Sequence, residues 1–116
     1  MTEKQEQITL FTWAAYRSDL QLMFHIPNEG NRSVQHTMSL IRQGMKPGVP
    51  DIFLPVPKGK YHGLFIEMKT DRGKPTAEQK RWQTELLANG YAATVCRGFE
   101  EAKETIEWYL RGAKHD

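Results

Sequence analysis

The sequence predicts an α/β fold in which helices flank a central mixed β-sheet, with the element order α-β-α-β-β-α-β-α. Short apolar runs bounded by glycine and proline alternate with longer segments of helical periodicity. Residues 64–96 read as strand, helix and strand, and the two strands of such a unit are parallel. The strand before this unit is joined to it by a turn, "PKGK", which makes an antiparallel hairpin. Parallel and antiparallel pairs together give a mixed sheet.

The first half of the chain supplies the predicted helices at 3–20 and 33–43, with a strand at 22–26 between them. In the first helix five residues share one face: Gln7, Ile8, Phe11, Ala14 and Ala15. In the second helix the apolar residues Val34, Met38 and Ile41 recur at helical spacing, and Gly44 is a plausible end.

The second half begins with strands at 51–56 and 62–70. Thr76 and Gln79 then form a capping-box pattern that starts a helix, and Gly90 ends it. A strand at 91–97 and a helix at 99–111 complete the chain, and the last helix has three apolar residues on one side: Ala102, Ile106 and Leu110.

Length and composition indicate one domain, residues 1–116, of a soluble globular protein. Hydrophobic residues make up 39% and charged residues 26%, and the net charge of +2 is compatible with a local basic face. The single cysteine, Cys96, excludes an internal disulfide and lies in an apolar run, as a buried small hydrophobic residue does. No apolar run approaches a membrane helix and the N-terminus is unlike a signal peptide, so we expect no membrane association and a reducing cytoplasm.

A charged pair marks the strand at 62–70. Because side chains alternate across a strand, Phe65, Glu67 and Lys69 share one face, opposite Leu64, Ile66 and Met68. In the antiparallel hairpin Asp51 faces Glu67 if the turn centres on Gly59, and faces Lys69 if it centres on Lys60. Either register brings the aspartate, the glutamate and the lysine to the same end of the sheet.

This trio predicts a metal site for phosphodiester hydrolysis. Two neighbouring carboxylates repel each other, and a divalent cation relieves that conflict. All-oxygen ligands suit Mg²⁺ or Mn²⁺, and a lysine beside the metal can orient the attacking water or stabilise negative charge on phosphorus. The alternative is a surface ion pair between Glu67 and Lys69 that contributes little.

The motifs resemble those of the VRR-NUC family, within the PD-(D/E)XK nuclease superfamily. The resemblance covers nearly the whole chain. It is carried by Gly48-Val49-Pro50-Asp51, a hairpin, Glu67-Met68-Lys69, Gly73 and "PTAEQKRW" with Gln79, and "HIPNEGNRS" and "GYAATVCRGFEEA" are similar to small stand-alone phage members. The resemblance implies a restriction-endonuclease-like core and metal-dependent cleavage of DNA. It also implies a homodimer that acts as a Holliday-junction resolvase.

The resemblance assigns roles to the candidate site. Asp51, Glu67 and the Met68 carbonyl are expected to ligate the metal, and Lys69 to hold or activate the attacking water. Family members supply a further glutamate from the first helix, for which Glu6 is the better match and Glu3 the rival. Gln79 would steady Lys69 or a water, or would only complete the capping box.

Other polar residues are candidate DNA contacts, although as solvated charges they need no function. The candidates are Lys46, Lys58, Lys60, Arg72, Lys74, Lys80 and Arg81, with Asn28 and Arg32 in the loop "PNEGNRS". The histidines at 25, 36 and 62 lack metal-ligand spacing, and we expect Trp13, Trp82 and Trp108 to lie in the core or an interface.

Together these observations predict a Mg²⁺- or Mn²⁺-dependent DNA endonuclease that selects branched or double-stranded DNA. The resemblance places it in phage DNA recombination, repair or processing, in the cytoplasm of a bacterial host. The rivals are a non-catalytic DNA-binding module on the same fold and a sequence-specific restriction enzyme.

Overall fold

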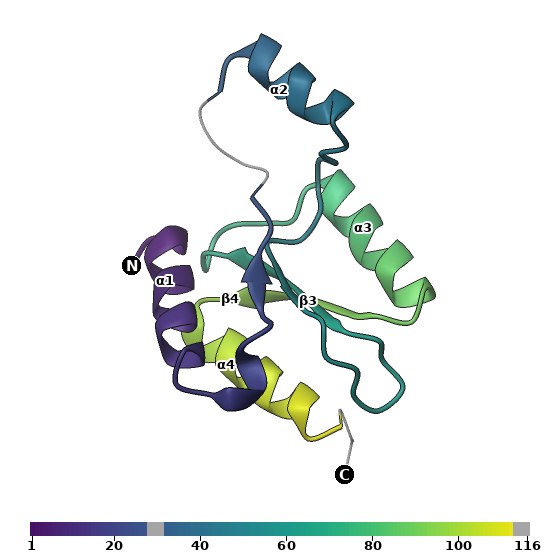
Figure 1. Ribbon diagram of the computed structural model, residues 1–116. Helices are drawn as coiled ribbons and strands as arrows, with labels where there is room; N and C mark the ends of the chain where they lie inside the picture. The colour runs from purple at the N-terminus through teal and green to yellow at the C-terminus, as the bar shows by residue number, and fades with distance from the viewer. Residues whose placement is uncertain (28–31, 113–116) are drawn as a thin grey trace.

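The computed structural model describes residues 1–27 and 32–112, and it has the predicted element order (Figure 1). The elements are α1 (Glu3–Ala14), the 3₁₀ helix η1 (Ser18–Leu20), β1 (Phe24–His25), α2 (Val34–Arg42), β2 (Ile52–Leu54), β3 (Leu64–Lys69), α3 (Ala77–Ala88), β4 (Ala92–Arg97) and α4 (Phe99–Leu110). The strand order is β1-β2-β3-β4. The pairs β1–β2 and β2–β3 are antiparallel and β3–β4 is parallel, which confirms the mixed sheet.

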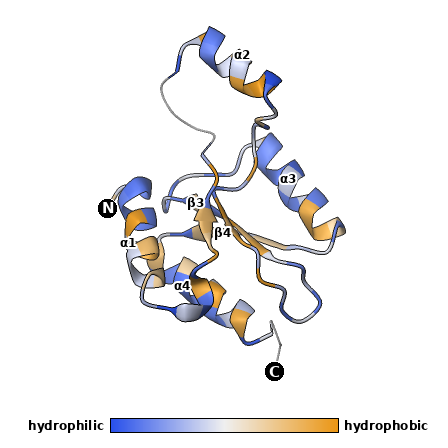
Figure 2. Ribbon diagram, in the orientation of Figure 1, coloured by the Kyte–Doolittle hydropathy of each residue, from blue (hydrophilic) through white to orange (hydrophobic). Residues whose placement is uncertain are grey.

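One face of the sheet carries the core. Ile52, Ile66 and Met68 on the strands are fully buried, and they belong to one cluster with Leu10 of α1 and Ile106 of α4. Figure 2 shows the strands at the centre of the molecule as hydrophobic. The alternation predicted for β3 is therefore confirmed, because Leu64, Ile66 and Met68 all belong to this cluster.

The first helix is shorter than predicted, and its predicted face is only partly buried. It ends at Ala14, and Arg17 leaves the helical conformation just before η1 and binds the Asp19 carboxylate. Ala14 of the predicted face is buried and Phe11 packs against the core, but Ile8 is 56% exposed, while Leu10, which was not on that face, is fully buried. The packing of α1 against β3 and α4 therefore buries Leu10 in place of Ile8.

The C-terminal helix follows the prediction with one change. Ala102 and Ile106 are fully buried as expected. The third fully buried position of α4 is Tyr109, whose hydroxyl donates to the Val56 carbonyl, and Leu110 is only partly buried at the edge of the core.

The second helix has an apolar face that nothing in the described chain covers. Ser33 caps α2, accepting a hydrogen bond from the His36 N–H. Val34, Met38 and Ile41 are 72%, 59% and 45% exposed, so the helix was predicted correctly but its apolar face is not part of the core. Figure 1 shows α2 standing away from the sheet and the other helices.

Two further predictions from the sequence concern the burial of Cys96 and the presence of membrane-spanning helices. Cys96 is fully buried against α4, which confirms the prediction of a buried small hydrophobic residue, and burial raises the pKa of its thiol to about 11. Among the residues that the structure describes, no helix is long and apolar enough to span a membrane.

Candidate active site

The hairpin register decides how the charged residues meet. Ile52 pairs with Ile66 and Leu54 with Leu64, so Asp51, one residue before β2, lies opposite Glu67. This is the register with a turn centred on Gly59, which adopts a φ of +56° that suits glycine. Asp51 and Glu67 are 5% and 4% exposed, and they are the buried charged residues of the described chain.

Asp51 is held from both neighbouring strands. Its Oδ2 accepts a hydrogen bond of 2.8 Å from the Met68 N–H, and its carbonyl oxygen accepts one of 2.6 Å from the Ile26 N–H. His25 Nδ1 lies 2.9 Å from the same carbonyl, so this histidine makes a structural contact. The aspartate carboxylate is therefore fixed over the start of the Glu67–Lys69 segment.

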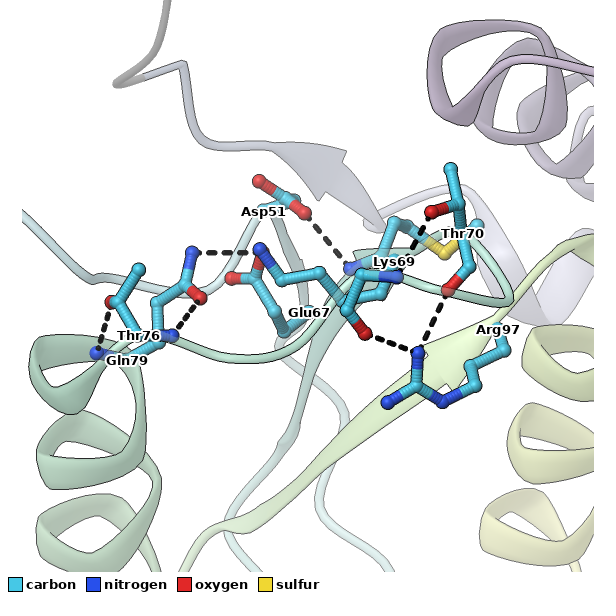
Figure 3. Close-up of polar contacts among 9 residues, drawn as sticks. Asp51, Glu67, Lys69, Thr70, Thr76, Gln79 and Arg97 are labelled. Carbon is cyan, nitrogen blue, oxygen red and sulfur yellow. Dashed lines mark hydrogen bonds and ion pairs between the residues drawn. The ribbon is translucent and has the colours of Figure 1, made fainter.

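Glu67, Lys69 and Gln79 form a second set of contacts beside it (Figure 3). The Lys69 ammonium lies 3.6 Å from Glu67 Oε2, and the two side chains are only 13% and 5% exposed. The Gln79 amide donates to the same oxygen at 3.2 Å. The ion pair considered as an alternative is thus present, but it is buried next to another carboxylate and is not a surface pair.

Gln79 completes the capping box that the sequence predicted, and its side chain also contacts Glu67, a partner that the sequence did not indicate. Its Oε1 accepts a hydrogen bond of 2.9 Å from the Thr76 N–H, and its backbone N–H donates to Thr76 Oγ1, which completes the capping box of α3. Its Nε2 remains directed at Glu67. One end of the amide starts the helix and the other holds the buried carboxylate.

Glu6 lies apart from the two buried carboxylates. Its Oε2 accepts a hydrogen bond of 2.9 Å from the Phe99 N–H, at the start of α4, where Gly98 provides no side-chain cap. It lines a cleft of about 340 Å³ together with Met1, Lys69, Thr70, Asp71, Arg72, Arg97 and Gly98. Within the described residues, no three Asp, Glu, His or Cys side chains gather at metal-ligand distance.

The donor set fits a hard divalent cation. Two buried carboxylates face each other across β2 and β3, and the Met68 carbonyl lies next to Glu67 in the chain. Mg²⁺ uses one or two carboxylates and completes its shell with water and phosphate oxygens, so a third protein carboxylate is not required. The cation would also balance the charge of a carboxylate pair that has one lysine beside it.

Comparison with known proteins identifies the family of the chain. The family model described as "VRR-NUC domain" matches residues 1–100. The chain belongs to the VRR-NUC family. It is also similar to a solved structure of a "VRR_NUC domain protein", with 26% sequence identity, a TM-score of 0.87, and coverage of 97% of this chain and 90% of that one. No curated protein matches the chain.

Membership of the VRR-NUC family confirms the resemblance read from the motifs and makes this a nuclease-type domain. The matched residues include each part of the candidate site described so far, from Glu6 to Phe99. The fold of the VRR-NUC neighbour matches the mixed sheet and its helices, so the predicted fold class is confirmed as well.

The candidate DNA contacts of this VRR-NUC domain lie at three separate places. Arg72 lines the cleft beside Lys69. Lys46 and Arg81 line a groove of about 550 Å³ with Trp82, whose indole N–H donates to the Pro47 carbonyl. Lys58 and Lys60 flank the hairpin turn, at the opposite end of β2 and β3 from Asp51 and Glu67.

The remaining candidates have less defined surroundings. Lys74 and Lys80 are exposed, on the loop before α3 and on its first turns. Arg32 is half-buried just before α2, and Asn28 lies outside the described residues. Trp13 and Trp108 pack at the edge of the core as predicted. Trp82 connects α3 to the segment at Pro47 through the hydrogen bond from its indole N–H.

Arg97 is the site residue that sequence reasoning missed. It ends β4 and pairs in register with Lys69. Its guanidinium Nη1 donates to the carbonyl oxygens of Thr70 and Gly73, in the turn that follows Lys69. The parallel pairing of the two strands, which the sequence did predict, was the available signal, because it places the ends of β3 and β4 side by side.

Proposed function

We propose that residues 1–116 form a single-domain DNA endonuclease that depends on Mg²⁺ or Mn²⁺. The observation that carries the proposal is the buried pair Asp51 and Glu67, which face each other across two strands with Lys69 beside them. Burying two carboxylates costs free energy, and a structural ion pair would need only one of them. A bound divalent cation and a phosphate account for the whole set.

In this proposal each residue of the candidate site has its own role. Asp51, Glu67 and the Met68 carbonyl would hold the cation, whose chemistry would be to polarise the phosphate and lower the pKa of bound water. Lys69 orients the attacking water or stabilises charge on the phosphate, at an ammonium 3.6 Å from Glu67. Gln79 fixes the Glu67 carboxylate, and Glu6 acts through water from the adjoining cleft.

No covalent intermediate is part of this proposal. The candidate site is built from carboxylates, a lysine and an amide, without a serine, cysteine or tyrosine nucleophile among them. Cys96, the chain's one thiol, is buried on the opposite face of the sheet against Thr105. Water therefore attacks phosphorus directly.

The preferred substrate in this proposal is branched DNA, cut by a homodimer. One site cuts one strand, and two symmetric cuts in a junction need two sites related by a twofold axis. The exposed face of α2, formed by Val34, Met38 and Ile41, supports a second copy as the partner. A helix of nine residues is marginal in water without packing, so a surface of another subunit would stabilise it.

The biological setting stays a proposal from the motif resemblance. We infer that the enzyme works in the cytoplasm of a bacterial host, in recombination, repair or processing of phage DNA.

The test is cleavage of labelled four-way junction, flap and linear duplex DNA with Mg²⁺ or Mn²⁺, comparing wild type with Lys69→Ala. We expect metal-dependent cuts, with paired cuts in the junction, and a loss of roughly a hundredfold or more in Lys69→Ala. Arg111→Ala, an exposed cation at the far end of α4, is the matched control and keeps its activity. If wild type and Lys69→Ala both bind DNA but neither cuts it, the protein is instead a non-catalytic DNA-binding module.

A further inference from the structure

The cleft next to Lys69 has more positive charge than the proposed chemistry uses. Lys69, Arg72 and Arg97 line it, against the carboxylates of Glu6 and Asp71. Glu6 accepts a hydrogen bond from the α4 backbone, which partly balances its charge. Arg72 is exposed on the turn after β3 and is available to an anion.

Arg97 is the best defined of these cations. It is half-buried, and its Nη1 donates hydrogen bonds to the Thr70 and Gly73 carbonyls, which uses both of its hydrogens. Neither oxygen carries a formal charge, and among the described residues no carboxylate forms an ion pair with the Arg97 guanidinium. Nη1 therefore fixes the position of the guanidinium, while Nη2 and Nε keep donors for an anion (Figure 3).

The turn that Arg97 contacts also has hydrogen bonds of its own. The Gly73 N–H donates to Thr70 Oγ1 at 3.1 Å and to the Thr70 carbonyl at 3.2 Å. A Cβ at Gly73 would lie 3.2 Å from Thr70 Oγ1 and 3.4 Å from Lys69 Cδ, so the turn packs closely on the lysine side chain. Arg97 thus holds this turn from one side, and the Lys69 side chain packs against it from the other.

We propose that this cleft is a subsite for the DNA phosphate next to the scissile one, with Arg97 as its main ligand. Arg97 is in register with Lys69 on the neighbouring strand, and neighbouring strands lie ~4.8 Å apart. Successive phosphates of one DNA strand advance ~3.4 Å along the helix axis and lie further apart in space because they also turn around it, so a cation on the next strand can contact the phosphate beside the one at Lys69. A guanidinium offers phosphate two parallel hydrogen bonds, so Arg97 sets the position of the strand as well as its affinity.

This inference rests on the proposed DNA substrate but not on cleavage, and its test measures binding alone. Binding of a four-way junction is measured with Ca²⁺ in place of Mg²⁺, at several salt concentrations, for wild type, Arg97→Gln and Arg111→Gln. Arg97→Gln should bind roughly tenfold more weakly, as for loss of one charged hydrogen bond. The decrease of log K with the logarithm of the salt concentration should also become less steep by about 0.9, as for loss of one phosphate contact.

A second measurement identifies the phosphate. Methylphosphonate, which is uncharged, replaces one linkage at a time around the cut site. One linkage next to the scissile one should weaken binding by wild type and by Arg111→Gln but leave Arg97→Gln unchanged. If Arg97→Gln is unfolded, Arg97→Lys replaces it and should keep the salt slope of wild type.

The outcomes separate this inference from the proposed function. Wild type that neither binds nor cuts DNA would overturn both. Wild type that cuts DNA, with Arg97→Gln keeping the wild-type slope, would overturn the subsite alone. The subsite is also overturned if methylphosphonate interferes at the scissile linkage only, because Arg97 would then contact the reacting phosphate, or if it interferes equally in Arg97→Gln and wild type.

Discussion

Gln79 of α3 joins the start of a helix to the buried Glu67 of β3. Its Nε2 donates to Glu67 Oε2 at 3.2 Å, and its Oε1 accepts from the Thr76 N–H at 2.9 Å. Because one planar amide makes both contacts, the position of the helix start determines the orientation of the carboxylate. The capping box is therefore also a support of the candidate active site.

Replacement of Gln79 and of Thr76 separates the two effects. Thr76→Ala removes the cap hydroxyl and should lower the free energy of unfolding by about 1 kcal/mol with little change in kcat. Gln79→Ala should cost a similar amount of stability and also lower kcat by roughly tenfold, since Glu67 loses a donor. Denaturant unfolding and cleavage kinetics measure both. Equal kcat in the two variants would reduce Gln79 to a capping residue.

Asp51→Asn should change stability in opposite directions without and with metal. The amide oxygen can still accept the hydrogen bond from the Met68 N–H, while the repulsion between Asp51 and Glu67 disappears. The metal-free variant should therefore melt at or above the wild-type temperature. It should also lose the rise in melting temperature that Mn²⁺ gives wild type by mass action.

The control for this metal effect is Glu104→Gln, which removes one exposed carboxylate from α4. Its melting temperature should rise with Mn²⁺ as that of wild type does. A full Mn²⁺ response in Asp51→Asn would show that the buried pair does not hold the metal.

Glu6 caps the start of α4, and in the proposed mechanism its negative charge also serves the metal site. Two substitutions distinguish these two roles. Glu6→Ala removes the acceptor of the Phe99 N–H and should cost about 1 kcal/mol of stability. Glu6→Gln keeps an acceptor oxygen and should be nearly as stable as wild type, yet should cut DNA more slowly if the charge serves the metal. Glu3→Gln is the matched control, and a greater loss of activity there would make Glu3 the relevant glutamate.

Local patterns predicted the parts of this site that depend on local geometry. The alternation along 64–69 and the turn signals at 57–60 brought Asp51, Glu67 and Lys69 to one end of the sheet, but they left two hairpin registers open, and the structure selects the one with the turn at Gly59. Only part of the buried stripe of α1 was predicted, since stripes that include Ile8 or Leu10 both have helical spacing and the packing of the helix buries Leu10. Arg97 was missed because its role arises from contacts with residues more than twenty positions away.

Cys96 makes the stability of the folded protein depend on pH in the alkaline range. Burial raises the pKa of its thiol from 9.0 to about 11, so the folded state favours the neutral form. This contribution to stability is complete below the unfolded pKa near 9, and is lost as the pH rises toward 11. A shift of this size corresponds to roughly 2–3 kcal/mol at full ionisation.

Cys96→Ala should therefore melt below wild type at pH 7, because it leaves a small cavity, but lose less stability between pH 9 and 11. Melting curves at pH 7, 9, 10 and 11 measure the difference between the two proteins, which cancels the titration of other groups such as Tyr109. Parallel curves over this range would contradict the thiol as the cause.

The proposed homodimer makes α2 the most informative surface to change. Met38→Glu places a charge at the centre of the apolar face formed by Val34, Met38 and Ile41, and should dissociate the dimer. His36→Glu adds the same side chain on the opposite face of the helix and should leave it intact. Sedimentation analysis reports the mass. In the junction assay Met38→Glu should give single nicks where wild type gives paired cuts, whereas a wild type that is monomeric with DNA bound would exclude the symmetric mechanism.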